Sequence, residues 1–226
     1  MPSLPQNLVD TVADDLLEKI VDGTYIAQQR LVISSLARDL GISAIPVREA
    51  LARLSGTGIV IFAPNIGYRV ASQLDKQGFI ELFEARLTLD LASVEGVLEF
   101  ARDEDIDALK ELNALIAGQQ YSTHAFGEFN QFTARNIQFH RLFVELSNNR
   151  FRLQLYDHLG LEMQISRHIV HSGIEFDTLI HGHDEIIDAL RARSSRDLRR
   201  VLIEHLTEGI NLMFPSNNKI ILQPAA

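Results

Sequence analysis

Residues 36–54 read LARDLGISAIPVREALARL, and this stretch decides the fold of the N-terminal part of the chain. Its first residues keep the apolar spacing of a helix, and Gly41 can take the left-handed conformation that ends one. Ser43 can cap a second helix. Pro46 is tolerated in the first turn of that helix, because the amides there lack intrahelical partners. The stretch therefore predicts two helices joined by a tight turn.

The second of these helices is predicted to have an inward and an outward face. Four apolar residues share the inward face, namely Val47, Ala50, Leu51 and Leu54. Ala44, Ile45 and Arg48 then point outward from its first turns. Two helices around a glycine turn are typical of the helix-turn-helix, whose second helix enters the major groove of DNA with its N-terminus first. The spacing alone also fits two ordinary core helices.

The neighbouring segments favour a DNA-binding unit. Downstream, residues 59–62 and 68–70 alternate like two short strands around the turn PNIG at 64–67. A hairpin in this place is the wing of a winged helix-turn-helix. Upstream, apolar residues recur about every four positions within 8–20, which predicts an amphipathic helix that ends by Gly23 and packs behind the other two.

The N-terminal part of the chain closely resembles the GntR family of bacterial transcription regulators. The residues that carry the resemblance are Asp22-Gly23-x-Tyr25, Leu31, Leu36-Ala37, Leu40-Gly41, Ser43, Pro46-Val47-Arg48-Glu49-Ala50-Leu51, Leu54, Gly58 and Gly67. The resemblance implies binding to double-stranded operator DNA. The expected DNA-binding residues are Arg38, Ser43, Ala44, Ile45, Arg48, Gly67 and Arg69. Family members commonly have Arg at the positions of Ala44 and Ile66, so operator affinity and base preference should differ here.

The composition limits the kinds of protein this chain can be. A chain of 226 residues, 46% of them hydrophobic, can form two modest cores. It has no cysteine, which excludes disulfides, thiolate metal sites and a cysteine nucleophile. No apolar stretch is long enough to span a bilayer, and residues 1–10 do not resemble a signal peptide. We therefore expect a soluble, cytoplasmic protein with no membrane partner.

The charge distribution predicts few, well-placed DNA contacts. The net charge is −9, but residues 1–74 hold six basic and seven acidic side chains, so the acidic excess lies in residues 75–226. A near-neutral DNA-binding domain binds phosphates weakly on its own. We therefore expect a homodimer in which two domains contact two half-sites.

Residues from 76 onward show only helical periodicity. The predicted helical spans are 76–102, 103–118, 124–148, 150–172, 176–193 and 195–213, separated by capping or turn residues. The predicted fold class is therefore mainly α. We expect a winged helix-turn-helix DNA-binding domain in residues 1–72, and an antiparallel all-α bundle for effector binding and dimerisation in residues 73–226.

This second domain resembles the all-helical, FCD-type ligand-binding domain of the FadR-like branch of the GntR family. The resemblance rests on Glu84-x-Arg86, Asn136-x-x-Phe139-His140, Asn149, His183 and His205. It implies a small-molecule effector and a metal site. The family often has Asp at the position of Asn136. The uncharged amide here either lowers metal affinity or leaves the site's full positive charge for an anionic effector, and we favour the second.

Three of the eight histidines can meet at one metal site. His183 lies eleven residues before Ser194 and His205 lies eleven after it, so an antiparallel helix pair brings both level, roughly 16 Å from the turn. Asn136 and His140 are four residues apart and share a helix face. Together they form a ligand set of three nitrogens and one oxygen, which suits Zn, Ni or Fe.

The other histidines are expected to be structural or exposed. His168 and His171 share a helix face at three-residue spacing, which could hold a metal, but no carboxylate shares that spacing to complete the site. His124, His158 and His181 are each isolated, and a lone histidine on a helix is usually a surface or hydrogen-bonded residue.

Arg86 is the candidate for binding the effector, together with Asn136. Its guanidinium can pair with the carboxylate of a small organic acid in bidentate fashion. The alternative is a structural ion pair with Asp90, four residues further along the same helix.

The predicted function is a non-enzymatic transcription regulator whose operator binding responds to a small carboxylate. Regulators of this kind usually repress transcription, but the sequence does not distinguish a repressor from an activator. A zinc hydrolase is a rival, since three histidines and an open position can activate water, but it lacks an evident general base. A ligand sensor that has lost DNA binding is a second alternative, which Ala44 and Ile66 favour.

Overall fold

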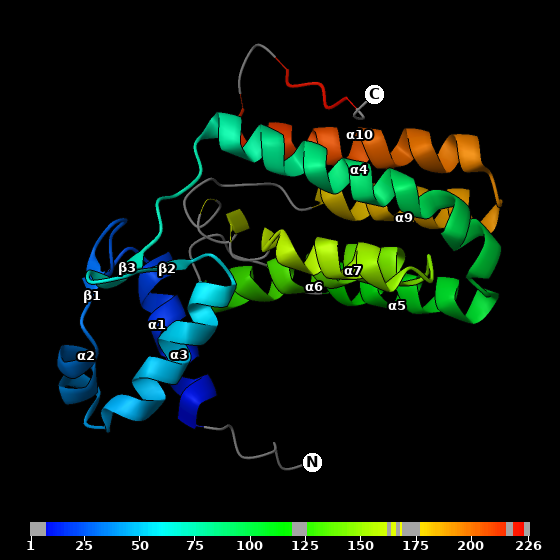
Figure 1. Cartoon of the computed structure of the whole chain (residues 1–226). Coiled ribbons are helices and arrows are strands. Elements are labelled where there is room, and N and C mark those ends of the chain that lie inside the picture. Colours follow the sequence, from blue (N-terminus) through cyan, green and yellow to red (C-terminus); the bar gives the residue numbers. More distant parts are fainter. Residues whose placement is uncertain are drawn as a thin grey trace. The chain divides into compact units, whose positions relative to one another are not determined.

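The computed structural model describes residues 8–118, 126–161, 164–165, 168, 177–215 and 219–223. The chain divides into two compact units, Met1–Gln73 and Leu74–Ala226. Helices dominate both, and the strands among the described residues form one small sheet in the first unit (Figure 1). The predicted mainly-α class is confirmed. No helix in the described ranges combines the length and apolarity needed to cross a lipid bilayer.

The first unit is a winged helix-turn-helix. Its helices are α1 (Leu8–Val21), α2 (Ile33–Leu40) and α3 (Ala44–Gly56), and its strands are β1 (Arg30–Leu31), β2 (Val60–Ala63) and β3 (Gly67–Val70). The strands pair antiparallel in the order β1-β3-β2. Helix α3 packs on α1 and α2. The inward residues of α3 that the sequence predicted are all buried, so the core of this unit lies along that face.

The turn between α2 and α3 forms around Gly41 as predicted. Gly41 has φ +68°, and its amide donates to the carbonyl of Arg38 at 3.2 Å. Ser43 takes the N-cap position of α3, but its side chain makes no capping hydrogen bond, so the predicted cap is wrong in that respect. A capping hydroxyl usually accepts from the third helical residue. That residue is Pro46, which has no N–H to donate.

The wing differs from its prediction by one residue. Strand β2 extends to Ala63, which pairs with Gly67, so Gly67 belongs to β3 and the turn consists of residues 64–66. The amide of Ile66 donates to the carbonyl of Ala63 at 3.1 Å. Strand β1 was not predicted, because two residues are too few to show an alternating pattern.

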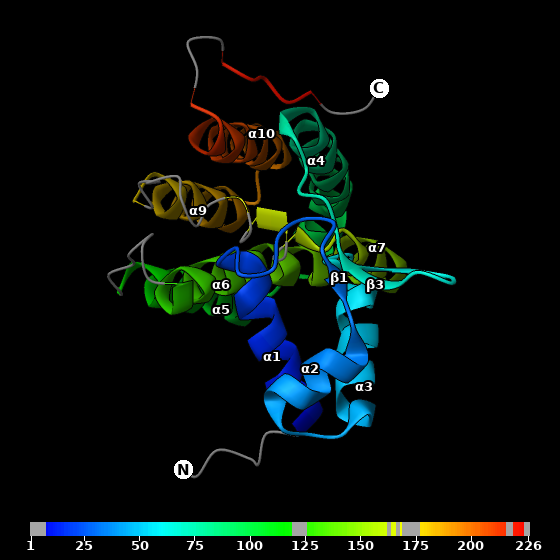
Figure 2. The same ribbon diagram turned by 90° about the vertical axis from the view of Figure 1, so that its left-hand side faces the viewer.

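The second unit is an antiparallel helical bundle. Its helices are α4 (Lys76–Phe100), α5 (Asp103–Ala117), α6 (Phe126–Glu145), α7 (Arg150–His158), α9 (Asp177–Arg191) and α10 (Ser195–Met213). Helix α10 packs on α9 and α4, while α5 packs on α9 and α6. The helices run roughly along one direction in Figure 1 and are seen nearly end-on in Figure 2.

Most of the predicted helices end within three residues of their expected positions, but the span 150–172 does not form one helix. Helix α7 ends at His158, and Gly160 takes φ +59°, a left-handed conformation that interrupts the helix. The predicted start at residue 124 and the predicted break at Ser172-Gly173 lie outside the described residues.

Candidate metal centre and DNA-binding surface

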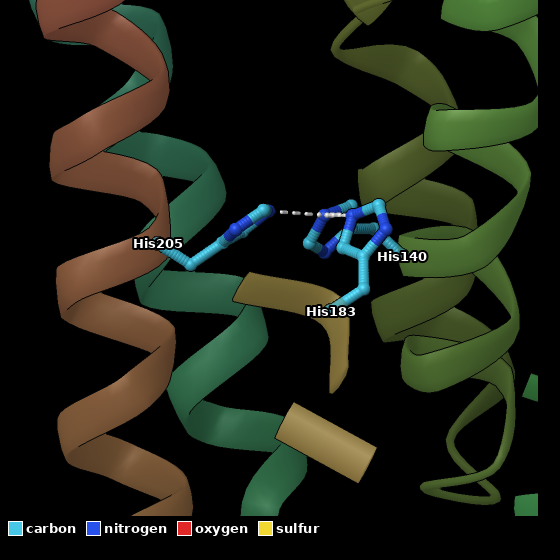
Figure 3. Close-up of side chains that lie close together, drawn as sticks. All are labelled: His140, His183 and His205. Carbon is cyan, nitrogen blue, oxygen red and sulfur yellow. Dashed lines mark hydrogen bonds between the residues drawn. The ribbon is translucent and has the colours of Figure 1, made fainter. Parts of the chain in front are cut away.

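Three buried imidazoles meet inside the second unit. His140 comes from α6, His183 from α9 and His205 from α10 (Figure 3). The Nε2 atom of His140 lies 3.0 Å from Nε2 of His205 and 3.2 Å from Nε2 of His183. One possible ligand atom from each of the three lies within 4.8 Å of the others. The three histidines that the sequence grouped therefore do converge, and their role as ligands, like that of Asn136, stays a prediction.

The level arrangement of His183 and His205 needs a small residue at position 182. The two rings have centroids 4.8 Å apart, as the equal spacing from Ser194 predicted. A Cβ atom on Gly182 would lie 2.3 Å from Nδ1 of His205. Only glycine lets α9 approach this ring so closely. Neither Gly182 nor its role was identified from the sequence.

Asn113 on α5 determines which nitrogen of His183 carries the proton. The side-chain NH2 of Asn113 donates to the carbonyl of Ile180 at 3.1 Å and to the carboxylate of Asp184 at 2.7 Å. Its Oδ1 must then accept from Nδ1 of His183, at 2.9 Å. A neutral His183 therefore presents the lone pair of Nε2 to the cluster, which is the orientation a metal ligand needs.

Sequence reasoning missed Asn113, although a signal was present. The apolar face of α5 runs Ile106, Leu109, Asn113 and Ile116, and all four side chains are buried. A lone amide within such a stripe indicates a buried hydrogen-bonding role, because burying an unpaired amide is costly.

Burial keeps the three imidazoles neutral. It lowers the pKa of His140 and of His183 well below the usual value, and the pKa of His205 falls to about 3. Proximity to the positive charge of Arg86 lowers each pKa further. Neutral imidazole is the form that coordinates a metal ion.

The histidine cluster fits a divalent cation better than it fits a hydrogen-bonded group. Because Nε2 of His183 carries a lone pair, His140 would have to donate to it from the same nitrogen that faces His205. One proton cannot serve both contacts well, and Nδ1 of His140 is buried without a partner among the described residues. Two nitrogens on one tetrahedral zinc lie about 3.3 Å apart, close to the spacings seen here. The three residues can therefore hold one ion.

A small cavity adjoins the cluster. It has a volume of about 30 Å³, and its polar lining comes from Arg86, Thr133, Asn136 and His205. This volume holds about two water molecules, since each water needs roughly 10–15 Å³ of such space. Oδ1 of Asn136, Oγ1 of Thr133 and Nη2 of Arg86 are buried and have no hydrogen-bond partner among the described residues. The cavity therefore offers unsatisfied donors and acceptors to a small polar ligand.

Arg86 forms the ion pair that was its alternative interpretation. Its Nε lies 3.6 Å from a carboxylate oxygen of Asp90, and both side chains are buried. Burial raises the pKa of Asp90 to about 7, while the charge of Arg86 opposes that rise. The pair is too long for a hydrogen bond. Arg86 thus keeps donor capacity toward the cavity, and its role in binding a carboxylate stays a prediction.

The predicted DNA-binding residues divide into exposed and partly covered ones. Arg38, Ser43, Ala44, Ile45 and Arg48 are exposed, on α2, the turn and the start of α3. Gly67 and Arg69, on β3, are half-buried.

A groove runs between these helices and the wing. It has a volume of about 370 Å³, and its lining includes Arg30, Ser34, Ala44, Arg48 and Ile66. Arg30 was not predicted as a DNA-binding residue. It lies opposite Arg69 in the β1–β3 pair. Its position beside the groove follows from that strand pairing, which the sequence did not predict.

The other histidines have structural or exposed positions in the part of the chain that is described. Nε2 of His168 lies 3.2 Å from the carbonyl of Met213, and its ring packs against Phe79 and Phe214. His158 and His181 are exposed. His124 and His171 lie outside the described residues.

Comparison with known proteins agrees with both units. Residues 8–70 match the gntR family of bacterial regulatory proteins, and residues 81–208 match the FCD domain. Escherichia coli (strain K12) McbR, an HTH-type transcriptional regulator, is 26% identical over 211 residues, covering 92% of this chain and 93% of that protein. The uncharacterized HTH-type transcriptional regulator YdhC of Bacillus subtilis (strain 168) is 23% identical over 193 residues, covering 85% of this chain and 84% of that protein.

The solved structure of E. coli McbR/YncC shares the fold, with a TM-score of 0.65 at 23% sequence identity. The matched region covers 94% of this chain and 99% of that chain. The relatives found are transcription regulators, and a regulator rather than an enzyme is what they imply. The chain belongs to the GntR family of bacterial regulatory proteins and is a DNA-binding transcriptional regulator with an FCD domain.

Proposed function

We propose that the FCD domain binds a divalent metal ion, Zn, Ni or Fe, through His140, His183 and His205, and a small organic acid beside it. Binding of the acid alters the affinity of a homodimer for operator DNA. The observation that carries the proposal is the convergence of three buried, neutral imidazoles, one of which has its lone pair directed into the cluster by Asn113.

The chemistry of the surroundings favours an anionic effector. All three histidines are neutral, and Asn136 adds an oxygen without a charge, so nothing in the ligand set cancels the charge of a bound cation. Such an ion would supply positive charge and open coordination positions. Arg86 adds a donor at the same cavity. A carboxylate is the common small ligand that matches a cation and a guanidinium together.

The small size of the cavity limits how the effector binds. A volume of about 30 Å³ accepts a carboxylate group but not the carbon chain of a larger organic acid. The remainder of the acid must displace side chains that line the cavity, such as Phe83, Leu206 or Met213. Because a ligand shifts an equilibrium only through its different affinity for two conformations, this displacement is the step that can couple the acid to DNA binding.

The test begins with metal analysis of the purified full-length protein. The protein is prepared without chelator, supplied with Zn or Ni, and compared with His183→Ala. We expect one ion per chain in the wild type and none retained in the variant. His158→Ala, which removes an exposed histidine, is the matched control and should keep its ion. Wild-type protein without stoichiometric metal contradicts the metal site, and the imidazoles would then bind the acid by hydrogen bonds.

A second measurement connects the metal to the effector and to the operator. Calorimetry with candidate carboxylic acids should show weaker binding to His183→Ala than to wild type. The same variant should still bind operator DNA but lose its response to the acid. If the acid still changes operator binding by the variant as much as by wild type, the metal has no part in regulation.

A further inference from the structure

Large apolar side chains are exposed around the DNA-binding face. Ile45, in the first turn of α3, is 67% exposed, and Ile66, at the tip of the wing, is 50% exposed. Phe62 and Val32 are exposed as well, and together with Ile66 they line the groove described above. Single exposed apolar residues are ordinary, but a group of them beside one groove indicates a contact surface.

The fold of this unit does not need Ile45. The inward face of α3 is complete without it, since Val47, Ala50 and Leu51 are fully buried. Ile45 instead shares the exposed first turn with Ala44, and Arg48 follows Ala44 by one helical turn. Residues at these helical positions are the ones that reach base edges when a recognition helix enters the major groove.

We propose that Ile45, with Ala44 beside it, recognises the 5-methyl groups of thymines in the operator, next to a guanine contacted by Arg48. The inference rests on the binding of operator DNA by this face. Neither side chain can form a hydrogen bond, and the thymine methyl is the apolar group that base edges present in the major groove. An arginine most often pairs with guanine. The half-site is therefore expected to combine thymines with a guanine.

The experiment removes the methyl group and nothing else from the DNA. Binding sites are first selected from random duplexes with the full-length protein. Each enriched thymine is then replaced by deoxyuracil, and affinity is measured by gel-shift titration at fixed salt. We expect a loss of about fourfold for each methyl that Ile45 contacts, the factor that corresponds to one buried methylene-sized group.

Two variants test whether Ile45 is the side chain that contacts the thymine methyl groups. In Ile45→Ala the same deoxyuracil replacements should change affinity by less than about twofold, because the contacting side chain is gone. Ile26→Ala is the matched control, since it shortens an equally apolar side chain that is 66% exposed and is not part of the groove lining. It should keep the wild-type sensitivity to deoxyuracil. Both variants should fold normally, because neither side chain is buried.

The possible outcomes distinguish a failure of thymine-methyl recognition from a failure of operator binding by this face. Wild-type binding that is unaffected by deoxyuracil at every enriched thymine overturns methyl recognition and leaves operator binding intact. Equal sensitivity in Ile45→Ala and wild type overturns the role of Ile45. A protein that selects no sequence at all overturns both operator binding by this face and the inference built on it.

Discussion

The two units invert the usual distribution of polar and apolar side chains in different ways. In the bundle, the interior holds Arg86, Asp90, Asn136 and three histidines, all of them buried. In the winged unit, isoleucine and phenylalanine side chains are exposed around the groove, while its basic residues are few. Burying polar groups and exposing apolar ones both cost free energy unless a partner compensates.

The comparison teaches that each unit is incomplete in a different way. In the part of the bundle that the structure describes, several buried polar atoms have no partner, and a small polar ligand or a cation can satisfy them. The winged unit has apolar surface without cover, which another macromolecule can bury. The deviations from the burial rule therefore indicate the kind of partner each unit takes. The predictions below test this division.

The largest expected effect concerns the number of winged units on the DNA. Scrambling one half-site of a selected operator should weaken binding at least about a hundredfold, because a homodimer then loses its second, effectively intramolecular contact. A near-neutral single domain cannot replace that contact. Gel-shift titration measures the loss, and light scattering with operator present should show a dimer. A stable monomer with full affinity for one half-site would contradict the prediction.

The second prediction tests the polar interior. Asn113→Ala removes the acceptor that fixes His183, so we expect metal affinity to fall by about 10- to 100-fold. Competition with a chelator of known affinity measures it. Gln138→Ala, an exposed position on the neighbouring helix α6, serves as the control. An unchanged affinity in Asn113→Ala would show that the orientation of His183 does not depend on this contact.

The third prediction tests the exposed surface. Arg48→Ala should weaken operator binding by more than about tenfold, while fold and effector binding stay intact. Arg53→Ala is the matched control, since Arg53 lies on the same helix but forms an ion pair with Asp10. Circular dichroism and gel-shift titration at fixed salt provide the readouts. Equal losses in the two variants would mean that Arg48 has no special place on the face.

The smallest expected effect is a dependence of stability on pH in the metal-free protein. The pKa of His205 is about 3 in the folded state and near 6.5 when unfolded. Between these values the unfolded chain binds a proton that the folded chain does not. The free energy of unfolding therefore decreases as pH falls below about 6.5, by about 1.4 kcal/mol per pH unit for this residue.

Asp90 acts in the opposite direction. Its pKa of about 7 in the folded state, against the usual 3.8, means that the folded chain gains stability as pH falls through that window. The contribution of His205 is therefore measured as a difference, by urea unfolding of wild type and His205→Gln between pH 6.5 and 5. The variant should show the shallower decrease. Parallel curves would show that His205 is not held neutral by burial.

Local patterns were enough to predict the wing, the place of the histidines and the helices other than the span 150–172. Apolar spacing defines α3 and α10, and equal distances from Ser194 bring His183 and His205 together, because a helix has a fixed rise per residue. Apolar spacing and the distance from a turn can both be determined from a short stretch of sequence. They also carry the family resemblance that the comparisons confirm.

Features that depend on packing between distant segments could not be predicted. Asn113 contacts His183, which is 70 positions away in the sequence. The residues around Asn113 give no indication of this partner. Gly182 is needed only because the ring of His205 lies against it. The missing cap at Ser43 is different, since Pro46 three residues later was visible and removes the amide that a capping hydroxyl needs.

The contact between Asn113 and His183 has a consequence for how the bundle can be observed. The Nδ1 proton of His183 is donated to an amide that is itself held by α9, so water reaches it only when α5 and α9 separate. Its exchange with deuterium is therefore governed by the free energy of opening that helix pair. This one imidazole proton, followed by NMR, gauges how tightly the bundle is closed, with no label on effector or DNA.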